Sequence, residues 1–378
     1  MLSYSHQSID ESDIQVVTKA LKSDILTGGK EVENFENALC EYVGVKYAAV
    51  LNSATSALHL AFESLNVKNK TVLCPAISFA ATSNTALMAG AKVEFIDIKS
   101  DGNIDEKKLE ARLQKKSDDI AAICVVDFAG NSVEIDTILE LSKKYNIPIL
   151  DDASHALGAE FKGKKVGSFA KTSILSFHPV KPITTLEGGA VLSDDEGLIE
   201  NVKLLRSHGI IKKKLWDSDM IKLGYNYRLS DVACVLGINQ LKKIDEMLKK
   251  REEICSFYDE HLAKNDFFSI IKIKEYKKSS RHLYPILLYP EFYCKKEFIF
   301  SKLIEKGIGV QVHYKPSYEF SFYKENFGEI FLENADNFYK AELSIPAHQC
   351  MSLKDANFVK DSLFEVFELA KKDNCDRI

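Results

Sequence analysis

The stretch AAICVVDFAGNSVEIDTILELSKKYNIPILDD, residues 121–152, contains two apolar runs joined by an amphipathic segment. Continuous apolar runs such as residues 121–126 are typical of parallel strands that are buried on both faces of a sheet. The segment between the runs has the spacing of a helix, and the second run ends in two aspartates. The stretch therefore predicts a strand, a helix and a second strand, with two carboxyl groups where that strand ends.

The same alternation extends to both sides of this stretch. It predicts further strands at residues 47–52, 71–74, 92–98 and 188–195, and helices at residues 55–65 and 79–90. Such regular alternation favours a largely parallel sheet that is covered by helices on both faces.

The pattern changes after Gly188, beyond the strand predicted at residues 188–195. Residues 229–262 have the spacing of two long helices, and the rest of the chain mixes helices with short strands at residues 282–288 and 309–314. We therefore predict an α/β protein with a large domain at residues 1–244, which includes an N-terminal arm, and a smaller C-terminal α+β domain at residues 245–378.

Composition and charge exclude several classes of protein. The chain has 378 residues, of which 46% are hydrophobic and 28% charged, and its net charge is −5. This is an ordinary globular profile, and the absence of a basic excess argues against a nucleic-acid partner. The uncharged residues 71–91 contain Pro75 and Asn84 and are not expected to cross a membrane.

Cysteine usage and the N-terminus indicate the compartment. The eight cysteines form no CxxC pair, and we interpret them as buried or idle thiols in a reducing compartment. The first residues contain neither a basic start nor an apolar core of a signal peptide. We expect a cytoplasmic protein.

Two strand ends carry polar residues whose role the pattern leaves open. Residues 52–57, NSATSA, lie between a predicted strand and a predicted helix, where free backbone N–H groups favour an anion. The same residues would also serve as a simple helix N-cap. The Asp152 carboxylate lies at the end of the strand predicted at residues 147–152. It could form a turn, bind a metal or pair with a cationic heterocycle.

A single lysine stands out in residues 176–189, SFHPVKPITTLEGG. Lys181 lies among apolar and hydroxyl side chains, ahead of a Gly-Gly step into an apolar strand. A desolvated amine has a lowered pKa and becomes a nucleophile that can form a Schiff base.

Together these segments resemble one family. The strand-end Asp152, residues 176–190 and residues 224–241, GYNYRLSDVACVLGINQL, are similar to the pyridoxal-phosphate-dependent nucleotide-sugar aminotransferases of the DegT/DnrJ/EryC1/StrS group. Within this group, several stretches resemble the 4-aminotransferases of pseudaminic acid biosynthesis. These stretches are residues 52–62, 101–110, 125–134, 176–185 and 310–316.

The resemblance implies roles for individual residues. Lys181 would form the Schiff base with the coenzyme and move protons, and Asp152 would pair with the pyridine nitrogen. Phe79 would stack on the ring, and His155 would lie near the ring hydroxyl. The phosphate would be held by Ala54, Thr55, Ser56 and Ser176, and by Asn226 from a second subunit. The sugar nucleotide would be lined by Tyr4, Asp24, Ile25, Leu26, Thr27, His313, Tyr314, Lys315 and Pro316.

The implied fold is that of pyridoxal-phosphate-dependent transferases of fold type I. The implied reaction transfers an amino group from L-glutamate to carbon 4 of a UDP-linked 4-keto-6-deoxy-N-acetyl amino sugar, with pyridoxamine phosphate as intermediate and no metal. The product would serve pseudaminic acid biosynthesis and flagellin glycosylation. The implied assembly is a homodimer with composite sites, and the apolar helix at residues 231–241 favours burial against the second subunit.

Three alternatives remain open at this point. The first is another 4-keto nucleotide-sugar aminotransferase, for example of the bacillosamine type. The second is a sugar dehydratase on the same fold, in which a histidine would replace Lys181. The third is a sugar-binding regulator, which would have no use for Lys181 and Asp152 together.

Overall fold

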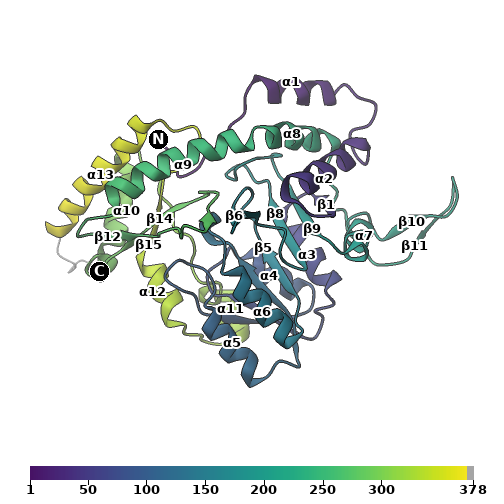
Figure 1. Cartoon of the computed structure of the whole chain (residues 1–378), viewed down its shortest axis with the longest axis horizontal. Helices are drawn as coiled ribbons and strands as arrows, with labels where there is room; N and C mark the ends of the chain where they lie inside the picture. The colour runs from purple at the N-terminus through teal and green to yellow at the C-terminus, as the bar shows by residue number, and fades with distance from the viewer. Residues whose placement is uncertain (373–378) are drawn as a thin grey trace.

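The computed structural model describes residues 1–372, and its centre is a seven-stranded sheet (Figure 1). In spatial order the strands are β1 (Tyr47–Leu51), β9 (Gly189–Ser193), β8 (Thr172–Ser176), β5 (Ile149–Asp152), β4 (Ile120–Val126), β2 (Thr71–Pro75) and β3 (Lys92–Ile96). β9 pairs antiparallel with both of its neighbours, and the other pairs are parallel. The predicted, mostly parallel sheet is confirmed.

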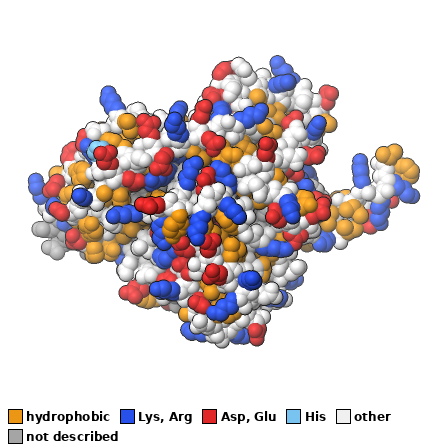
Figure 2. Space-filling model, in the orientation of Figure 1, with side chains coloured by type: hydrophobic (Ala, Val, Ile, Leu, Met, Phe, Trp, Pro, Cys, Tyr) orange, Lys and Arg blue, Asp and Glu red, His pale blue; other side chains and the backbone are white. Residues whose placement is uncertain are grey.

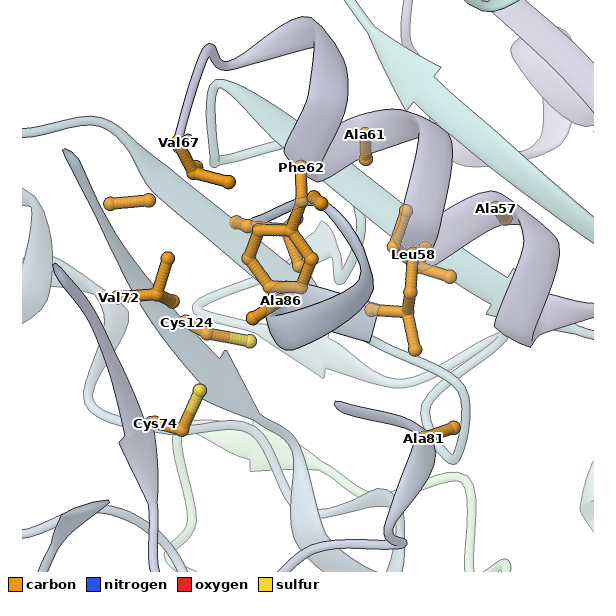
Figure 3. Packing of buried hydrophobic residues seen from close by; sticks show 14 of the residues in the cluster. Ala57, Leu58, Ala61, Phe62, Val67, Val72, Cys74, Ala81, Ala86 and Cys124 are labelled. Carbon is orange, nitrogen blue, oxygen red and sulfur yellow. The ribbon is translucent and has the colours of Figure 1, made fainter. Parts of the chain in front are cut away.

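Helices cover both faces of this sheet because alternate strand residues point to opposite sides. Val72, Cys74 and Cys124 point into one cluster, in which Phe62 of the neighbouring helix fills the space above the strands (Figure 3). Leu73 and Ile123 point into a separate cluster on the other face. The helices of the first face are α3 (Ala54–Ser64), α4 (Ala81–Met88) and α7 (Glu196–Leu205), and those of the second are α5 (Glu106–Lys115) and α6 (Ile135–Tyr145).

A further group of helices lies near β1 and β9. It consists of α1 (Glu11–Ala20), α2 (Lys30–Val43) and α8 (Asp231–Lys242). α8 packs against α1 and α2 of its own chain, and a Cβ at Gly237 would lie 2.5 Å from Phe35 Cζ. The sequence favoured burial of α8 against a second subunit. Burial against a second subunit stays a prediction: α1 and α2 cover part of the apolar surface of α8, and Val232, Val235 and Ile238 remain half-buried.

The C-terminal region has its own antiparallel sheet and its own core. The sheet contains β12 (Phe268–Ile270), β14 (Tyr284–Leu288) and β15 (Glu342–Ile345), and the helices are α9 (Ile244–Leu262), α10 (Lys296–Glu305), α11 (Ser321–Phe327), α12 (Glu333–Ala341) and α13 (Leu353–Lys372). α9 places Met247 in the core near β1 and Tyr258 in the C-terminal core. A domain boundary between residues 244 and 245 stays a prediction, because this helix belongs to both cores.

The predicted strand at residues 309–314 does not form. Only single bridges join Ile308 to Leu2 and Gln311 to Ser344. The backbone N–H of His313 instead donates to the Glu342 carboxylate at 2.6 Å. The N–H of His313 is therefore bound by a side-chain carboxylate and not by a backbone carbonyl, so the pairing with β15 does not continue beyond the bridge at Gln311.

The N-terminal arm lies against the C-terminal region. The N–H of Leu2 donates to the carbonyl of Gly307 at 2.7 Å, and the carbonyl of Tyr4 accepts from the N–H of Ala347 at 3.2 Å. The hydroxyl of Ser5 donates to the carbonyl of Val180 at 2.8 Å. The arm thus connects the C-terminal region to the residue that precedes Lys181.

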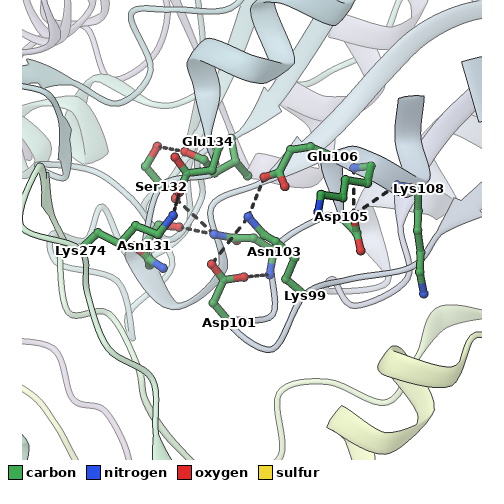
Figure 4. A network of polar contacts seen from close by, with 12 residues as sticks. Lys99, Asp101, Asn103, Asp105, Glu106, Lys108, Asn131, Ser132, Glu134 and Lys274 are labelled. Atoms are coloured by element: carbon green, nitrogen blue, oxygen red, sulfur yellow. Dashed lines mark hydrogen bonds and ion pairs between the residues drawn. The ribbon is translucent and has the colours of Figure 1, made fainter. Parts of the chain in front are cut away.

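Polar contacts fix the loops that follow β3 and β4 (Figure 4). The Asn103 side chain donates to the carbonyl of Asn131 at 2.9 Å and accepts from the N–H of Phe128 at 2.9 Å. Glu134, in the same loop, pairs with Lys274 at 2.8 Å. A small sheet of β13 (Lys277–Lys278), β6 (Glu160–Phe161) and β7 (Lys164–Lys165) adds a second link between the large sheet's loops and the C-terminal region.

A two-stranded hairpin, β10 (Ile210–Lys212) and β11 (Ser218–Met220), projects away from the body (Figures 1 and 2). Its tip carries Leu215 and Trp216, which are 89% and 83% exposed.

The prediction of free thiols is confirmed for the buried Cys74, Cys124, Cys234 and Cys255, and Cys40 and Cys350 are free as well. It is wrong for Cys294, which is disulfide-bonded. Within residues 1–372, every helix is too short or too polar to cross a membrane.

Candidate active site

The N-terminus of α3 forms one wall of the candidate site. Ser53 is the N-cap, and its hydroxyl accepts from the N–H of Ser56 at 3.0 Å. The first N–H groups of a helix have no acceptor within the helix, so those of Ala54 and Thr55 can serve an anion. β9 approaches closely here, because a Cβ at Gly189 would lie 2.4 Å from the Ala54 nitrogen.

Asp152 is buried at the end of β5, where the sequence placed a carboxylate. It accepts from the Thr82 hydroxyl at 2.8 Å and from the N–H of Ser154 at 3.3 Å. Its neighbour Asp151 points to the other face of the sheet. Burial, with the nearby charge of Asp127, raises the pKa of Asp151 well above its usual value, which favours its neutral form.

The loop that follows β8 carries Lys181 and is closed by its own side chains. The Thr184 hydroxyl donates to the carbonyl of Phe177 at 3.0 Å, and the Thr185 hydroxyl donates to the carbonyl of Glu187 at 2.7 Å. Burial lowers the pKa of the Lys181 amine to about 7, although the Asp152 carboxylate opposes this shift. The loop therefore presents an amine that is largely available as a nucleophile near neutral pH.

Ser176, the last residue of β8, is buried at the start of the same loop.

Aromatic and imidazole rings form the opposite wall. The Tyr314 hydroxyl lies 3.0 Å from His155 Nε2. The ring of Phe79, which is 60% exposed, lies 6.0 Å from that of Tyr314, and the ring of Tyr4 lies 5.2 Å from that of His313. The structure therefore brings these five predicted residues together, although they come from four separate segments.

The remaining predicted sugar-site residues on this side lie just beyond Tyr314. Lys315 extends over the ring of Phe320, with Nζ 5.5 Å from its centre. Pro316 is buried and precedes a short turn at Ser317–Glu319.

Two predicted segments lie apart from Lys181. The exposed residues Asp24, Ile25, Leu26 and Thr27 form a loop over the start of α8, where the carbonyl of Leu26 accepts from the N–H of Asp231 at 3.0 Å. Asn226 is exposed beside the end of β1, and its carbonyl lies 3.5 Å from the Asn52 side chain. Within residues 1–372, we find no hydrogen bond that joins either segment to Lys181.

Two residues near the reactive groups were missed in the sequence. Thr82 lies inside a predicted helix, and its hydrogen bond to Asp152 could not be inferred from the spacing. His282 begins a predicted strand, yet its Nε2 lies 3.3 Å from Lys181 Nζ. The two residues are 101 positions apart, so no local pattern links them.

A model of the DegT/DnrJ/EryC1/StrS aminotransferase family matches residues 7–364. The chain belongs to this family. The predicted fold and the enzyme class, a pyridoxal-phosphate-dependent aminotransferase, are therefore confirmed.

Similar proteins narrow the subgroup. A UDP-4-amino-4,6-dideoxy-N-acetyl-beta-L-altrosamine transaminase of Campylobacter jejuni is 72% identical over 99% of this chain and 100% of its own length. The transaminase of that name from Helicobacter pylori is 42% identical over 97% of this chain and 98% of its own.

Solved structures give the same result. Helicobacter pylori PseC, described as an aminotransferase involved in the biosynthesis of pseudoaminic acid, is 41% identical and aligns with a TM-score of 0.93 over 97% of this chain and 99% of its own. A putative sugar aminotransferase from Streptococcus pneumoniae, solved in its PLP-form, is 28% identical and aligns with a TM-score of 0.90 over 97% and 98%.

Proposed function

We propose that this protein transfers the amino group of L-glutamate to carbon 4 of UDP-2-acetamido-2,6-dideoxy-β-L-arabino-hex-4-ulose, a step of pseudaminic acid biosynthesis that serves flagellin glycosylation. The observation that carries the proposal is the 72% identity to the Campylobacter jejuni transaminase over 99% of the chain. A nucleotide-sugar substrate also fits an enzyme that works in the cytoplasm. The bacillosamine-type aminotransferase and the dehydratase have no comparable support.

The residues present fit pyridoxal phosphate. The first turn of α3 and Ser176 would hold its phosphate, and the buried Asp152 carboxylate would hold a proton on its ring nitrogen. His155 Nδ1 is buried without a hydrogen-bond partner within residues 1–372, so His155 still has a free polar atom for a ligand. The exposed ring of Phe79 leaves one face open for stacking.

When bound, the coenzyme supplies a carbonyl that condenses with amines and a pyridinium ring that accepts electrons. The protein's part is to position and protonate. Lys181 would hold the coenzyme and would take up and return a proton at Nζ, which a pKa of about 7 allows in both directions. Asp152 would pair with the ring nitrogen and keep it protonated.

The sugar nucleotide would lie between the two walls. Tyr4, His313, Tyr314 and Pro316 offer rings and polar edges for the sugar, and Lys315 offers a point charge for the diphosphate. The exposed loop at residues 24–27 would contact the nucleotide from the other side.

A homodimer with composite sites completes the proposal. Asn226 is exposed and makes no hydrogen bond with Lys181 within residues 1–372, and by its resemblance to the family it would reach the coenzyme phosphate of a second subunit. The adjacent exposed side chains of Ile25 and Leu26, and of Leu215 and Trp216, would be available for such an interface.

The test is an assay of the purified protein with L-glutamate and the L-arabino or D-xylo epimer of the UDP-linked 4-keto sugar. We expect formation of 2-oxoglutarate and preference for the L-arabino epimer. The matched controls are Lys181→Ala, which should abolish turnover, and Lys171→Ala, which removes an exposed lysine paired with Asp195 and should not. Better turnover of the D-xylo epimer would overturn the proposed substrate assignment. Turnover by Lys181→Ala would overturn the proposed role of Lys181.

A further inference from the structure

The amine of Lys181 has a single hydrogen-bond partner within residues 1–372. That partner is His282, whose Nε2 lies 3.3 Å from Lys181 Nζ. His282 comes from the segment that leads into β14 of the C-terminal region, whereas Lys181 lies in a loop of the central sheet. The contact therefore joins the reactive amine to the second sheet.

His282 is held firmly from two sides. Its carbonyl accepts from Arg251 Nη1 at 3.3 Å, and Arg251 itself is fully buried in α9. Its ring lies 4.5 Å from the ring of His155, at an angle of 51°. The neighbouring Ser280 hydroxyl donates to the carbonyl of His155 at 2.5 Å. The position of the imidazole is thus fixed by packing and by backbone contacts.

The imidazole of His282 is an acceptor toward Lys181. Burial, together with the charge of Lys181, holds the pKa of His282 well below its usual value, so the ring is neutral at pH 7. A neutral imidazole has one N–H donor and one acceptor nitrogen. The ammonium form of Lys181 can only donate, so toward it Nε2 is the acceptor and the hydrogen is assigned to Nδ1, which is buried without a partner within residues 1–372.

We propose that His282 orients the amine of Lys181 by accepting a hydrogen bond at Nε2, so that Nζ keeps a fixed direction while it takes up and returns a proton. This inference rests on the proposed function, in which Lys181 is the proton carrier. The proton stays on Nζ between the two transfers, and His282 changes neither its charge nor its hydrogen count. His282 is therefore an orienting group and not a second base.

The charged and titratable groups that face Lys181 set the expected shift. They are Asp152, His155, His282 and His313, with Arg251 farther away. Of these, His282 is the one within hydrogen-bond distance of Nζ. An accepted hydrogen bond stabilises the ammonium form more than the amine, so loss of the acceptor should lower the pKa of Lys181 by about one unit, which is a tenfold change in the equilibrium.

Three substitutions separate the hydrogen bond from the packing. His282→Gln places an amide oxygen near the position of Nε2, whereas His282→Asn is one methylene shorter and cannot reach Nζ. His282→Phe keeps a ring but has no acceptor. The matched control is His348→Phe, because His348 is another buried histidine of the C-terminal region that contacts His6 and not Lys181.

The first measurement uses the protein without coenzyme. The rate at which an amine-selective reagent modifies Lys181 is followed against pH by mass spectrometry of the Lys181 peptide. We expect the apparent pKa to fall by about one unit in His282→Asn and His282→Phe, and to stay near the wild-type value in His282→Gln and His348→Phe. If His282→Phe does not fold, the comparison of Gln with Asn decides alone.

The second measurement is the single-turnover rate of the coenzyme-loaded enzyme with L-glutamate. It should fall about 10- to 100-fold in the Asn and Phe variants and recover in the Gln variant. If His282→Gln and His282→Asn have the same pH profile of Lys181 modification and the same single-turnover rate, and Lys181→Ala is inactive, the orienting role of His282 is overturned and the proposed function is not. Turnover by Lys181→Ala would instead overturn the proposed function itself.

Discussion

Asp152 and Ser176 end two neighbouring strands of the central sheet, whereas His313 and Tyr314 lie in a loop that forms no strand. We call the first group, with Lys181 and the first turn of α3, the cofactor side, and the loop at residues 313–316, with Tyr4, the sugar side. Backbone pairing of β5 with β8 fixes the cofactor side. Side-chain contacts with Glu342 and Ser344 fix the loop of the sugar side.

The difference explains how one fold can serve many substrates. A coenzyme common to a family needs groups at invariant positions, and the ends of paired strands provide them. A substrate that varies needs contacts that can change without loss of the sheet, and loops held by side chains allow this. The two sides should therefore respond differently to substitution.

The largest effect is expected from Asp152→Asn on the cofactor side. The amide has no charge to keep a ring proton in place, so kcat should fall about 10²- to 10³-fold. The KM for the sugar nucleotide should change by less than about threefold, because the sugar side is untouched. Steady-state kinetics with both substrates, and the absorbance of the bound coenzyme, measure these quantities.

Asp151→Asn is the matched control for Asp152→Asn. Asp151 is the adjacent residue of β5, but burial raises its pKa and favours its neutral form, which an amide imitates. We expect kcat within about threefold of the wild-type value. Similar losses in the two variants would show that burial of a carboxyl group, and not the charge of Asp152, matters on the cofactor side.

A mixed dimer tests whether Asn226 acts at the active site of its own subunit or at that of the second subunit. Inactive Lys181→Ala chains and weakened Asn226→Ala chains, combined in equal amounts, should form heterodimers in half of the pairs. One of the two sites in each heterodimer would have both residues, so activity should recover to about a quarter of the wild-type value. Activity no higher than that of the two separate variants would assign Asn226 to its own chain.

Much of the cofactor side could be predicted because its signals are local. The apolar run that forms β5 ends directly at Asp152, and Lys181 lies in a short segment with an unusual composition. The resemblance to the family then assigned these residues their roles. Such signals need no knowledge of the tertiary structure.

The sugar side could be predicted less well because its contacts are distant in sequence. Residues 309–314 have a strand pattern, yet the N–H of His313 is taken by Glu342, which is 29 positions away. The contact of His282 with Lys181 spans 101 positions. The packing of α8 against α1 and α2 of its own chain was missed for the same reason, since the spacing of α8 alone does not reveal it.

The smallest expected effect is on stability and concerns the carboxyl group that holds the sugar-side loop. Glu342 is fully buried, and burial raises its pKa to about 8. Its Oε2 lies 2.6 Å from the N–H of His313 and its Oε1 lies 2.6 Å from the Ser344 hydroxyl. The neutral acid can keep both contacts by donating to Ser344, whose hydroxyl then donates to His313 Nδ1.

A pKa raised above the unfolded value fixes the sign of the pH dependence. The stabilising contribution of Glu342 is complete below about pH 4.5 and is lost as the pH rises through about 8, because ionisation is penalised only in the folded state. Glu342→Gln imitates the neutral acid and does not ionise. Its Tm should match that of the wild type near pH 5 and exceed it by about 2–5 °C near pH 8. The exposed Glu305→Gln, which removes a surface pair with Lys302, should show no such divergence. A constant Tm difference between pH 5 and 8 would mean that Glu342 does not titrate in this range and that its ionisation does not set the stability of the sugar-side loop.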